Sequence, residues 1–240
     1  MSNNIIKQNM PKEFVKKRYY TLLDVKKHSR STDCWVVLFG QVLDLTKTIQ
    51  ENFTSSLCKP LADYAGKDVS HWFNVRSGEP KTRVNPTTGM KEYYFPDGRY
   101  LHCPESGPET NNLELNYGAT ATETNIEVPW WRDVKLIMGH LTEKSRKIRI
   151  INMLTHQEDI IEVPCEETIN EILVRYKEFN EHADSYTWKT VTNKPLLMVG
   201  TLTDNEIFDE TEKYQEFDIP SDEWYIPPIL IYFNDDLTEA

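Results

Sequence analysis

The sequence predicts an α+β protein made of two small modules. Three observations lead to this prediction. The first part of the chain alternates β-forming runs with short helical patterns, a polar stretch without periodicity occupies the middle, and a second series of hairpin, helix and strands follows it. A chain of 240 residues with 39% apolar and 11% aromatic residues is long enough to bury two small cores.

The first module starts with a helix signal and a hairpin signal. Thr21 is placed to N-cap a short helix, with Asp24 closing a capping box. Residues 34–46, CWVVLFGQVLDLT, hold two apolar runs on either side of Gly40-Gln41, which predicts a tight hairpin. The helical spacing of apolar residues in 57–66 predicts a second helix that ends at a glycine.

Several short motifs in this region stand in the order and near the spacing of a known family. They are Tyr20-Thr21-Leu22, Trp35, Val42, Asp44-Leu45-Thr46 and Ala65-Gly66-Lys67-Asp68. Together they resemble the first half of the cytochrome b5-like haem-binding domain, over about residues 19–75. No single motif is specific, but the combination is. The resemblance implies a cytochrome b5-like fold for the first module.

The resemblance also implies a haem held by two axial histidines. Counted from Tyr20, the first ligand position falls on Asn52, and the residue nearest to the second is Arg83. An amide is a poor iron ligand, and a guanidinium is a permanent cation that cannot coordinate iron. We therefore expect no cofactor at these positions. Haem bound through a rearranged loop by His71 or His102 is the alternative, and the competing interpretation of both histidines is a hydrogen-bonded structural role.

A ribbon and a linker are expected next. Residues 82–103 contain two turn signals, which predict a β-meander appended to the first module, so that this module spans 19–103. Residues 104–144 are predicted to form an extended linker, because polar residues, Pro and Gly dominate its first part. Trp130 and Trp131 are costly to expose. We expect them to anchor the linker on the protein's own surface or on a partner, which makes them candidates for partner docking.

The second module is expected over residues 145–235. Two alternating strands come first, then a helix whose capping box is Thr168 with Glu171, then further strands that end with an apolar one. This order resembles ubiquitin, a β-grasp fold. An acidic insertion at 208–224 interrupts the series, and the chain ends without Gly-Gly. The resemblance therefore implies docking and no ubiquitin-type conjugation.

Charge divides the chain into a basic start and an acidic end. Residues 1–30 hold eight Lys and Arg against two acids, and the first 18 are expected to form a basic arm. Residues 204–240 hold twelve acids against Lys213, and 236–240 are expected to form an acidic tail. Such an end disfavours nucleic acid and would suit a basic partner. The basic arm permits contact with the acidic tails of microtubules.

The sequence carries no recognised catalytic motif, so we expect no enzyme. It has no P-loop, no nucleophile elbow, no zinc-protease helix and no dinucleotide-binding glycine pattern. Its four cysteines lack metal-ligand spacing and are interpreted as idle thiols, and no metal site is expected. No apolar run is long enough for a membrane span, and no signal peptide opens the chain. We expect an intracellular protein.

The two modules in this order, with the motifs PWW, SYTW and YFNDDLTE, resemble a family of two-module proteins of motile cilia. The resemblance implies a structural and regulatory protein in the radial spoke stalks of the axoneme, located in the cytoskeleton of the cilium and affecting cilium movement. Its partners would be axonemal radial spoke proteins. The family's association with haem and redox control implies the alternative function, a haem-binding redox sensor or electron carrier of the cytochrome b5 type.

Overall fold

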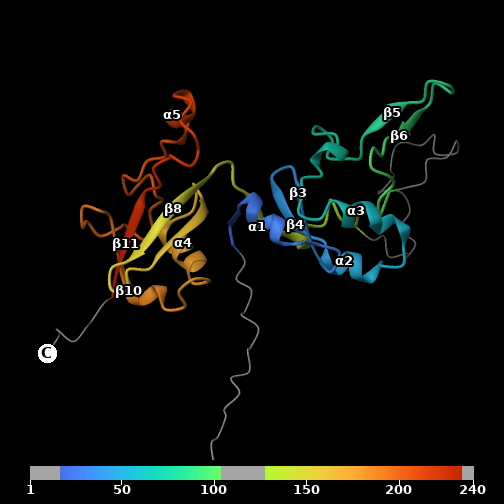
Figure 1. Ribbon diagram of the computed structural model, residues 1–240. Helices are drawn as coiled ribbons and strands as arrows, with labels where there is room; N and C mark the ends of the chain where they lie inside the picture. The colour runs from blue at the N-terminus through green and yellow to red at the C-terminus, as the bar shows by residue number, and fades with distance from the viewer. Residues whose placement is uncertain (1–16, 104–127, 234–240) are drawn as a thin grey trace, which may run out of the picture.

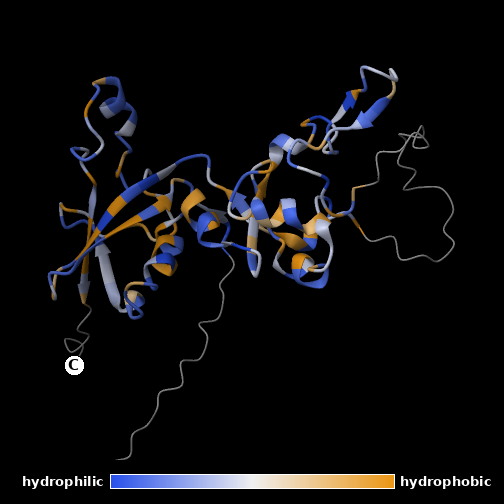
Figure 2. Cartoon of the chain, turned by 45° about the vertical axis from the view of Figure 1, so that its right-hand side comes forward, coloured by the Kyte–Doolittle hydropathy of each residue, from blue (hydrophilic) through white to orange (hydrophobic). Residues whose placement is uncertain are grey.

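The computed structural model describes residues 17–103 and 128–233. They form two modules, which lie side by side in Figure 1 with the first on the right and the second on the left. Apolar residues gather where the helices meet the sheets of each module (Figure 2). The predicted basic arm, apart from Lys17 and Arg18, and the predicted acidic tail lie outside the described residues.

A five-stranded sheet in the order β1-β7-β4-β3-β2 forms the centre of the first module. Its strands are β1 (Tyr19–Tyr20), β2 (Ser29–Arg30), β3 (Asp33–Leu38), β4 (Gln41–Asp44) and β7 (Ile137–Leu141). The helices are α1 (Leu22–Lys27), α2 (Thr46–Glu51), α3 (Lys59–Asp63) and the 3-10 turns η1 (Ser56–Cys58), η2 (Ser70–Trp72) and η3 (Val134–Leu136). This mixed arrangement agrees with an α+β first module.

Local signals of the first module formed as predicted, with small shifts. The Thr21 hydroxyl accepts from the Asp24 backbone N–H and the Asp24 carboxylate accepts from the Thr21 N–H, so the capping box is confirmed. The hairpin of β3 and β4 is also confirmed, but its turn is Phe39-Gly40, both with positive φ. The helix predicted for 57–66 is divided into η1 and α3.

The sheet of the first module is buried on both faces. Along β3, Cys34, Val36 and Leu38 face the larger core, which includes residues of α3, η2 and the loop after it. Between them, Trp35 and Val37 face a second cluster together with side chains of α1, β1 and β4. A strand buried on both faces reads as a continuous apolar run, which is why residues 34–38 lack polar alternation.

The linker predicted for 104–144 is wrong in its last part. Trp130 and Trp131 are 1% and 9% exposed and lie in the larger core of the first module. β7 then pairs antiparallel with β4 and parallel with β1, so this segment completes the first sheet. A Cβ on Gly139 would lie 2.7 Å from the Lys17 carbonyl oxygen, so the close approach of β1 requires glycine there.

The appended ribbon is a single hairpin, so the predicted meander is wrong for its second half. β5 (Thr82–Val84) pairs antiparallel with β6 (Lys91–Tyr93). The turn at Pro96-Asp97-Gly98 forms, but it leads to Tyr100 and Leu101, which enter the core without strand pairing. The segment does not form a third strand, because the Tyr100 and Leu101 side chains are buried in the core instead. The ribbon projects away from the helices (Figures 1 and 2).

The second module contains a four-stranded sheet in the order β10-β11-β8-β9. Its strands are β8 (Ser145–Asn152), β9 (Glu158–Pro164), β10 (Tyr186–Lys189) and β11 (Pro228–Phe233), and its helices are α4 (Ile169–Tyr176), α5 (Thr211–Glu216) and the 3-10 turn η4 (Ala183–Ser185). β8 and β9 form a hairpin, and β11 runs parallel to β8. The capping box of Thr168 with Glu171 is confirmed.

One apolar core lies between this sheet and α4. Ile148 and Ile150 of β8 pack with Ile169 and Ile172 of α4, as the helical and strand periodicities predict. Phe179 lies beyond the end of α4 and is 52% exposed. The acidic insertion contains α5. In the part of the chain that the structure describes, no helix combines the length and apolar character needed to span a bilayer.

Candidate functional site

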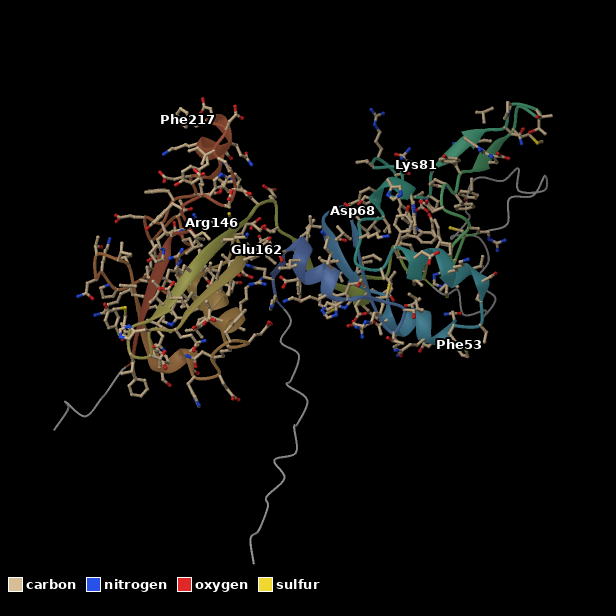
Figure 3. All side chains as sticks on the ribbon, in the orientation of Figure 1. Phe53, Asp68, Lys81, Arg146, Glu162 and Phe217 are labelled. Atoms are coloured by element: carbon tan, nitrogen blue, oxygen red, sulfur yellow. The ribbon has the colours of Figure 1, made fainter. Side chains whose placement is uncertain are left out.

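Asn52 occupies the first family ligand position and is engaged by its own backbone neighbourhood. It follows α2 as the C-cap residue, and its Nδ2 donates to the Thr48 carbonyl oxygen at 3.0 Å. Its own carbonyl accepts from the Ser55 N–H at 2.9 Å and from the Cys58 thiol at 3.2 Å. Phe53 beside it is 77% exposed at the outer edge of the module (Figure 3). This loop is a closed turn.

Arg83 lies on the ribbon and forms an ion pair with Glu92 on the neighbouring strand. Its Nε donates to Glu92 Oε1 at 2.7 Å, and its guanidinium lies 5.3 Å from the centre of the Tyr94 ring. The hydrogen bond from Arg83 is the main reason why the pKa of Glu92 lies below its usual range. The Arg83 side chain is 58% exposed. It therefore belongs to the solvated face of β5 and β6.

His71 belongs to a polar group at the edge of the aromatic core. Its Nε2 lies 3.3 Å from Asp97 Oδ2, and the same oxygen accepts from Trp72 Nε1 at 2.7 Å. Hydrogen bonds from Trp72, Tyr64 and His71, in that order of strength, lower the pKa of Asp97. The His71 side chain is 48% exposed and borders a surface hollow. Asp97 thus orients both the imidazole and the indole.

His102 is hydrogen-bonded to the segment that begins at residue 128. It has a positive φ of 68°, and its Nδ1 accepts from the Trp130 backbone N–H at 3.0 Å. Burial raises the pKa of the adjacent Cys103 thiol to about 12, so this thiol stays protonated at neutral pH. The hydrogen bond from the Trp130 N–H gives His102 a structural role, which is to hold Trp130 in place.

Aromatic rings fill the interior against which the helices pack. Trp72 and Tyr100 are stacked at 4.8 Å between ring centres. The ring centres of Phe73, Trp130 and Trp131 lie 5.8 to 6.1 Å from that of Tyr100. Trp72, Tyr100 and Trp130 are each 1% exposed. Among the described residues no cluster of three or more His, Cys, Asp or Glu could hold a metal ion. Asn52 and Arg83, the residues at the family ligand positions, do not fit a haem.

The two modules meet at a buried ion group that joins α1 to α4. Arg175 Nη1 donates to Asp24 Oδ2 at 2.6 Å, and its Nε and Nη2 donate to the two oxygens of Glu167 at 3.1 and 2.6 Å. The three side chains are 6%, 10% and 3% exposed. A planar guanidinium with a carboxylate on each side is the arrangement that a buried arginine requires. We call this group the inter-module joint.

Electrostatics hold the joint in its charged form. Burial disfavours the Arg175 cation, but Glu167 and Asp24 outweigh that effect and raise its pKa. Burial also raises the pKa of Asp24, and Arg175 more than offsets the change, so the net pKa of Asp24 is lowered. For Glu167, burial outweighs the opposing effect of Arg175, so the net pKa of Glu167 is raised. The joint therefore depends on Arg175 more than on either acid.

Surface contacts continue the joint on either side. Arg18 Nη2 donates to Glu171 Oε2 at 3.1 Å and to the Glu166 carbonyl oxygen at 3.2 Å. The Glu166 carboxylate accepts from the Thr142 hydroxyl at 2.5 Å and from the Glu143 N–H at 2.9 Å. The short connection between β7 and β8 is thus bonded to the second module. The orientation of the two modules is fixed by side chains and backbone together.

Comparison with known proteins places this architecture in a family. The family model described as "Cytochrome b5-like Heme/Steroid binding domain" matches residues 21–96. Cytochrome b5 domain-containing protein 1 of Xenopus tropicalis is 43% identical over 94% of this chain and 98% of its own length. The chain belongs to the cytochrome b5 domain-containing protein 1 family. The human member is 42% identical over 95% of this chain and 94% of its own length.

Similarity to cytochrome b5 itself covers a much smaller share of the chain. Cytochrome b5 of Oryctolagus cuniculus is 38% identical over 34% of this chain and 60% of its own length. The Xenopus and human members of the cytochrome b5 domain-containing protein 1 family thus match nearly the whole chain, while cytochrome b5 matches about a third of it. Glu167 and Arg175 of the inter-module joint lie outside the residues that the cytochrome b5-like family model matches.

The sequence interpretation of this family member found the two histidines and missed the joint. Asp24 was recognised only as a capping residue. A signal was present in Arg175, which follows Ile172 by three residues and so falls on the apolar face of α4. A charge on an apolar helical face indicates a buried partner. The sequence pattern does not show that this partner is Asp24, because Asp24 is 151 residues away.

Proposed function

We propose that the protein is a non-enzymatic structural and regulatory interaction protein of the motile-cilium axoneme, a radial spoke stalk component that affects beating. The inter-module joint is the observation that carries the proposal. A protein that only carried electrons would need its first module alone. A buried three-residue ion group between modules instead fixes two surfaces at one spacing and orientation, which is what a docking component of a repeated assembly requires.

We also propose that the second module is ubiquitin-like, of the β-grasp type. The support is its topology: a hairpin, one crossing helix and later strands, with β8 and β11 parallel at the centre of the sheet. In the described part of the chain β9 forms one outer edge of the sheet and offers a place for a partner strand or helix, while the edge at β10 is bonded to residues 194–196. Such a module would act by docking to a partner.

The location can be tested on isolated axonemes. We expect a tagged chain, expressed in ciliated cells that lack the endogenous protein, to stay in the axoneme after detergent extraction and to cross-link to radial spoke proteins. Glu51→Gln, which alters only an exposed ion pair with Lys47, is the matched control and should behave like the unaltered chain. Recovery of the tagged chain only in the soluble fraction would refute the proposal.

The second candidate function is haem-based redox sensing, and one observation favours it. His71 is half exposed and borders a hollow together with Arg76 and Lys81, two cations that suit the propionates of a porphyrin. If haem binds there, added haemin will give a shifted Soret band that is lost in His71→Ala. The His102→Ala variant controls for the other histidine.

We expect no His71-dependent Soret shift. The Nε2 of the imidazole is already held by Asp97, and iron ligation by this nitrogen would require that contact to break. A stoichiometric haem spectrum that survives purification and disappears in His71→Ala would overturn the non-haem assignment of the first module and favour the redox sensor.

A further inference from the structure

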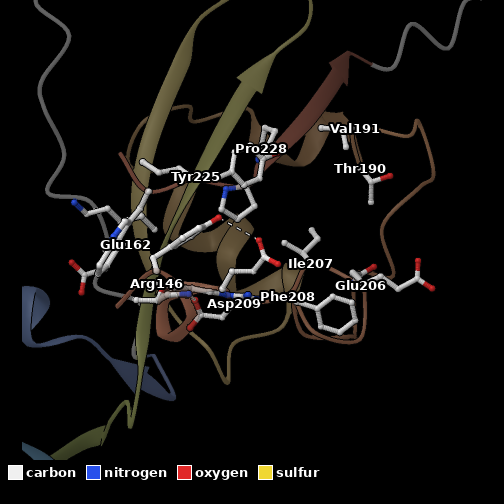
Figure 4. Close-up of a pocket in the computed structure, with 18 of the residues that line it drawn as sticks. Arg146, Glu162, Thr190, Val191, Glu206, Ile207, Phe208, Asp209, Tyr225 and Pro228 are labelled. Carbon is white, nitrogen blue, oxygen red and sulfur yellow. Dashed lines mark hydrogen bonds between the residues drawn. The ribbon is translucent and has the colours of Figure 1, made fainter. Parts of the chain in front are cut away.

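A cavity of about 630 Å³ opens on the second module beneath the acidic insertion. β8 and β9 form one side, and the segments that precede and follow α5 form the other (Figure 4). Arg146 lies in its wall (Figure 4). This size is in the range of pockets that enclose small organic ligands or the end of a peptide.

Arg146 is buried without a partner. The residue is 6% exposed, and within the described residues none of its three guanidinium nitrogens donates a hydrogen bond to a protein group. Along β8 it falls on the same face as Ile148 and Ile150, so it sits at the end of the apolar core. Burial lowers its pKa, and Cys165 and Asp209 oppose the effect only through longer-range attraction. An unpaired buried cation is costly unless it has a function.

The acids near Arg146 are engaged elsewhere. Asp209 Oδ2 lies 2.8 Å from Lys144 Nζ, and its Oδ1 accepts from Thr211. Glu162 accepts from the Ser145 hydroxyl at 2.5 Å. The two other acids of the wall are also bonded to neighbours: they are Glu206, with Lys194, and Glu210, with Lys213 and Tyr214. Among the described residues of this cavity wall, Arg146 is therefore a buried cation to which none of these acids is hydrogen-bonded.

The rest of the wall limits what that counterion can be. Four acids line the cavity, so a multiply charged group such as a phosphate dianion would be repelled. A single carboxylate would match the planar guanidinium with two parallel hydrogen bonds. Aromatic and apolar side chains complete the wall, and Phe208 and Tyr225 are 62% and 61% exposed at its edge. They favour an apolar body attached to the carboxylate.

We propose that this cavity binds a carboxylate carried on an aromatic or branched aliphatic body, with Arg146 as its counterion. The carboxylate belongs either to a small organic acid or to the C-terminus of a peptide, since both present the same group. In either case the acid enters past the exposed rings, and its two oxygens accept from the guanidinium of Arg146. The buried cation thereby gains the pairing that the protein itself does not supply.

Titration calorimetry on the full chain tests the proposal with matched probes. Indole-3-propionate and indole-3-propionamide differ only in the charge, and a short peptide ending in Trp with a free carboxylate pairs with its C-terminal amide. We expect each acid to bind at least about tenfold more tightly than its amide. Whichever pair binds more tightly identifies the source. Inorganic phosphate should not compete.

Substitutions assign the effect to Arg146. Arg146→Met should reduce the preference for acid over amide to about one, and Arg146→Lys should retain part of it. Arg149→Met, on the same strand with its side chain paired to Glu158, should leave the preference unchanged. If Arg146→Met folds poorly, Tyr225→Ala at the exposed edge serves instead and should weaken acid and amide alike.

Three results would overturn the proposal. The first is equal affinity for acid and amide in the unaltered chain. The second is an undiminished preference in Arg146→Met. The third is no heat of binding for either acid at about 1 mM, a concentration at which even a weak specific site is occupied.

Discussion

The second module contains two arginines that are equally withdrawn from solvent, in opposite circumstances. Arg175, 5% exposed, has a carboxylate on each side in the inter-module joint. Arg146, 6% exposed, faces a cavity and has no bonded acid in the described chain. Burial alone therefore does not indicate what an arginine does. The partner does: a satisfied guanidinium holds structure together, and an unsatisfied one marks a place for a ligand.

The largest expected effect comes from removing the paired arginine. Arg175→Met leaves Asp24 and Glu167 buried without their cation, which should destabilise the fold by about 3–5 kcal/mol. For a chain of this size the melting temperature should fall by roughly 10 °C. Thermal unfolding followed by circular dichroism measures it. Chemical cross-linking of the first module to the second, measured on the purified protein, should also decrease.

Arg146→Met is the comparison for that experiment, because it removes an equally buried arginine. Here a methionine stem replaces an unpaired charge, so stability should stay the same or rise by about 1 kcal/mol. Opposite signs for the two substitutions would support the distinction between joint and pocket. A comparable loss in both would show that Arg146 has a structural role, and the distinction would then be abandoned.

A smaller effect is expected from neutralising one acid of the joint. Asp24→Asn keeps an oxygen for the capping box and leaves Glu167 to pair Arg175, so the loss should be about 2 kcal/mol at pH 7. Glu51→Gln, an exposed pair, is the matched control. A difference from Glu51→Gln that lies within error would refute the assignment of Asp24 to the joint.

The same variant gives a pH test with a definite sign. Because the folded-state pKa of Asp24 lies below its ordinary value, its stabilisation is present above the unfolded pKa and is lost as the pH falls through the folded pKa. The difference in melting temperature between the unaltered chain and Asp24→Asn should therefore shrink from pH 7 to about pH 3. A difference that stays constant over this range would contradict the lowered pKa.

How much of this the sequence allowed depends on distance along the chain. Both capping boxes were predicted, since Thr21 with Asp24 and Thr168 with Glu171 are only three residues apart. Trp130 and Trp131 were assigned to the linker because their partners come from residues 72–100, on the other side of a long polar segment. Hydrophobic periodicity carries no information about such returns of the chain.

The two buried arginines were in principle visible in the sequence and were not recognised. Arg146 alternates with Ile148 and Ile150, which places it on the inward face of a predicted strand. Arg175 similarly lies on the apolar face of a predicted helix. Pattern therefore shows that an arginine is buried. Only the fold shows whether an acid from elsewhere in the chain reaches it, which is the property that separates the joint from the pocket.

The smallest effect is expected at a third arginine, which is exposed. Arg83 pairs with Glu92 at 2.7 Å, as short as the contacts of the joint, but its side chain is 58% exposed. Water competes for an exposed ion pair and screens it, so Arg83→Gln should change the melting temperature by no more than about 1 °C. The effect should also vanish in high salt. A loss as large as that of Arg175→Met would mean that the length of an ion pair, and not its burial, decides its contribution.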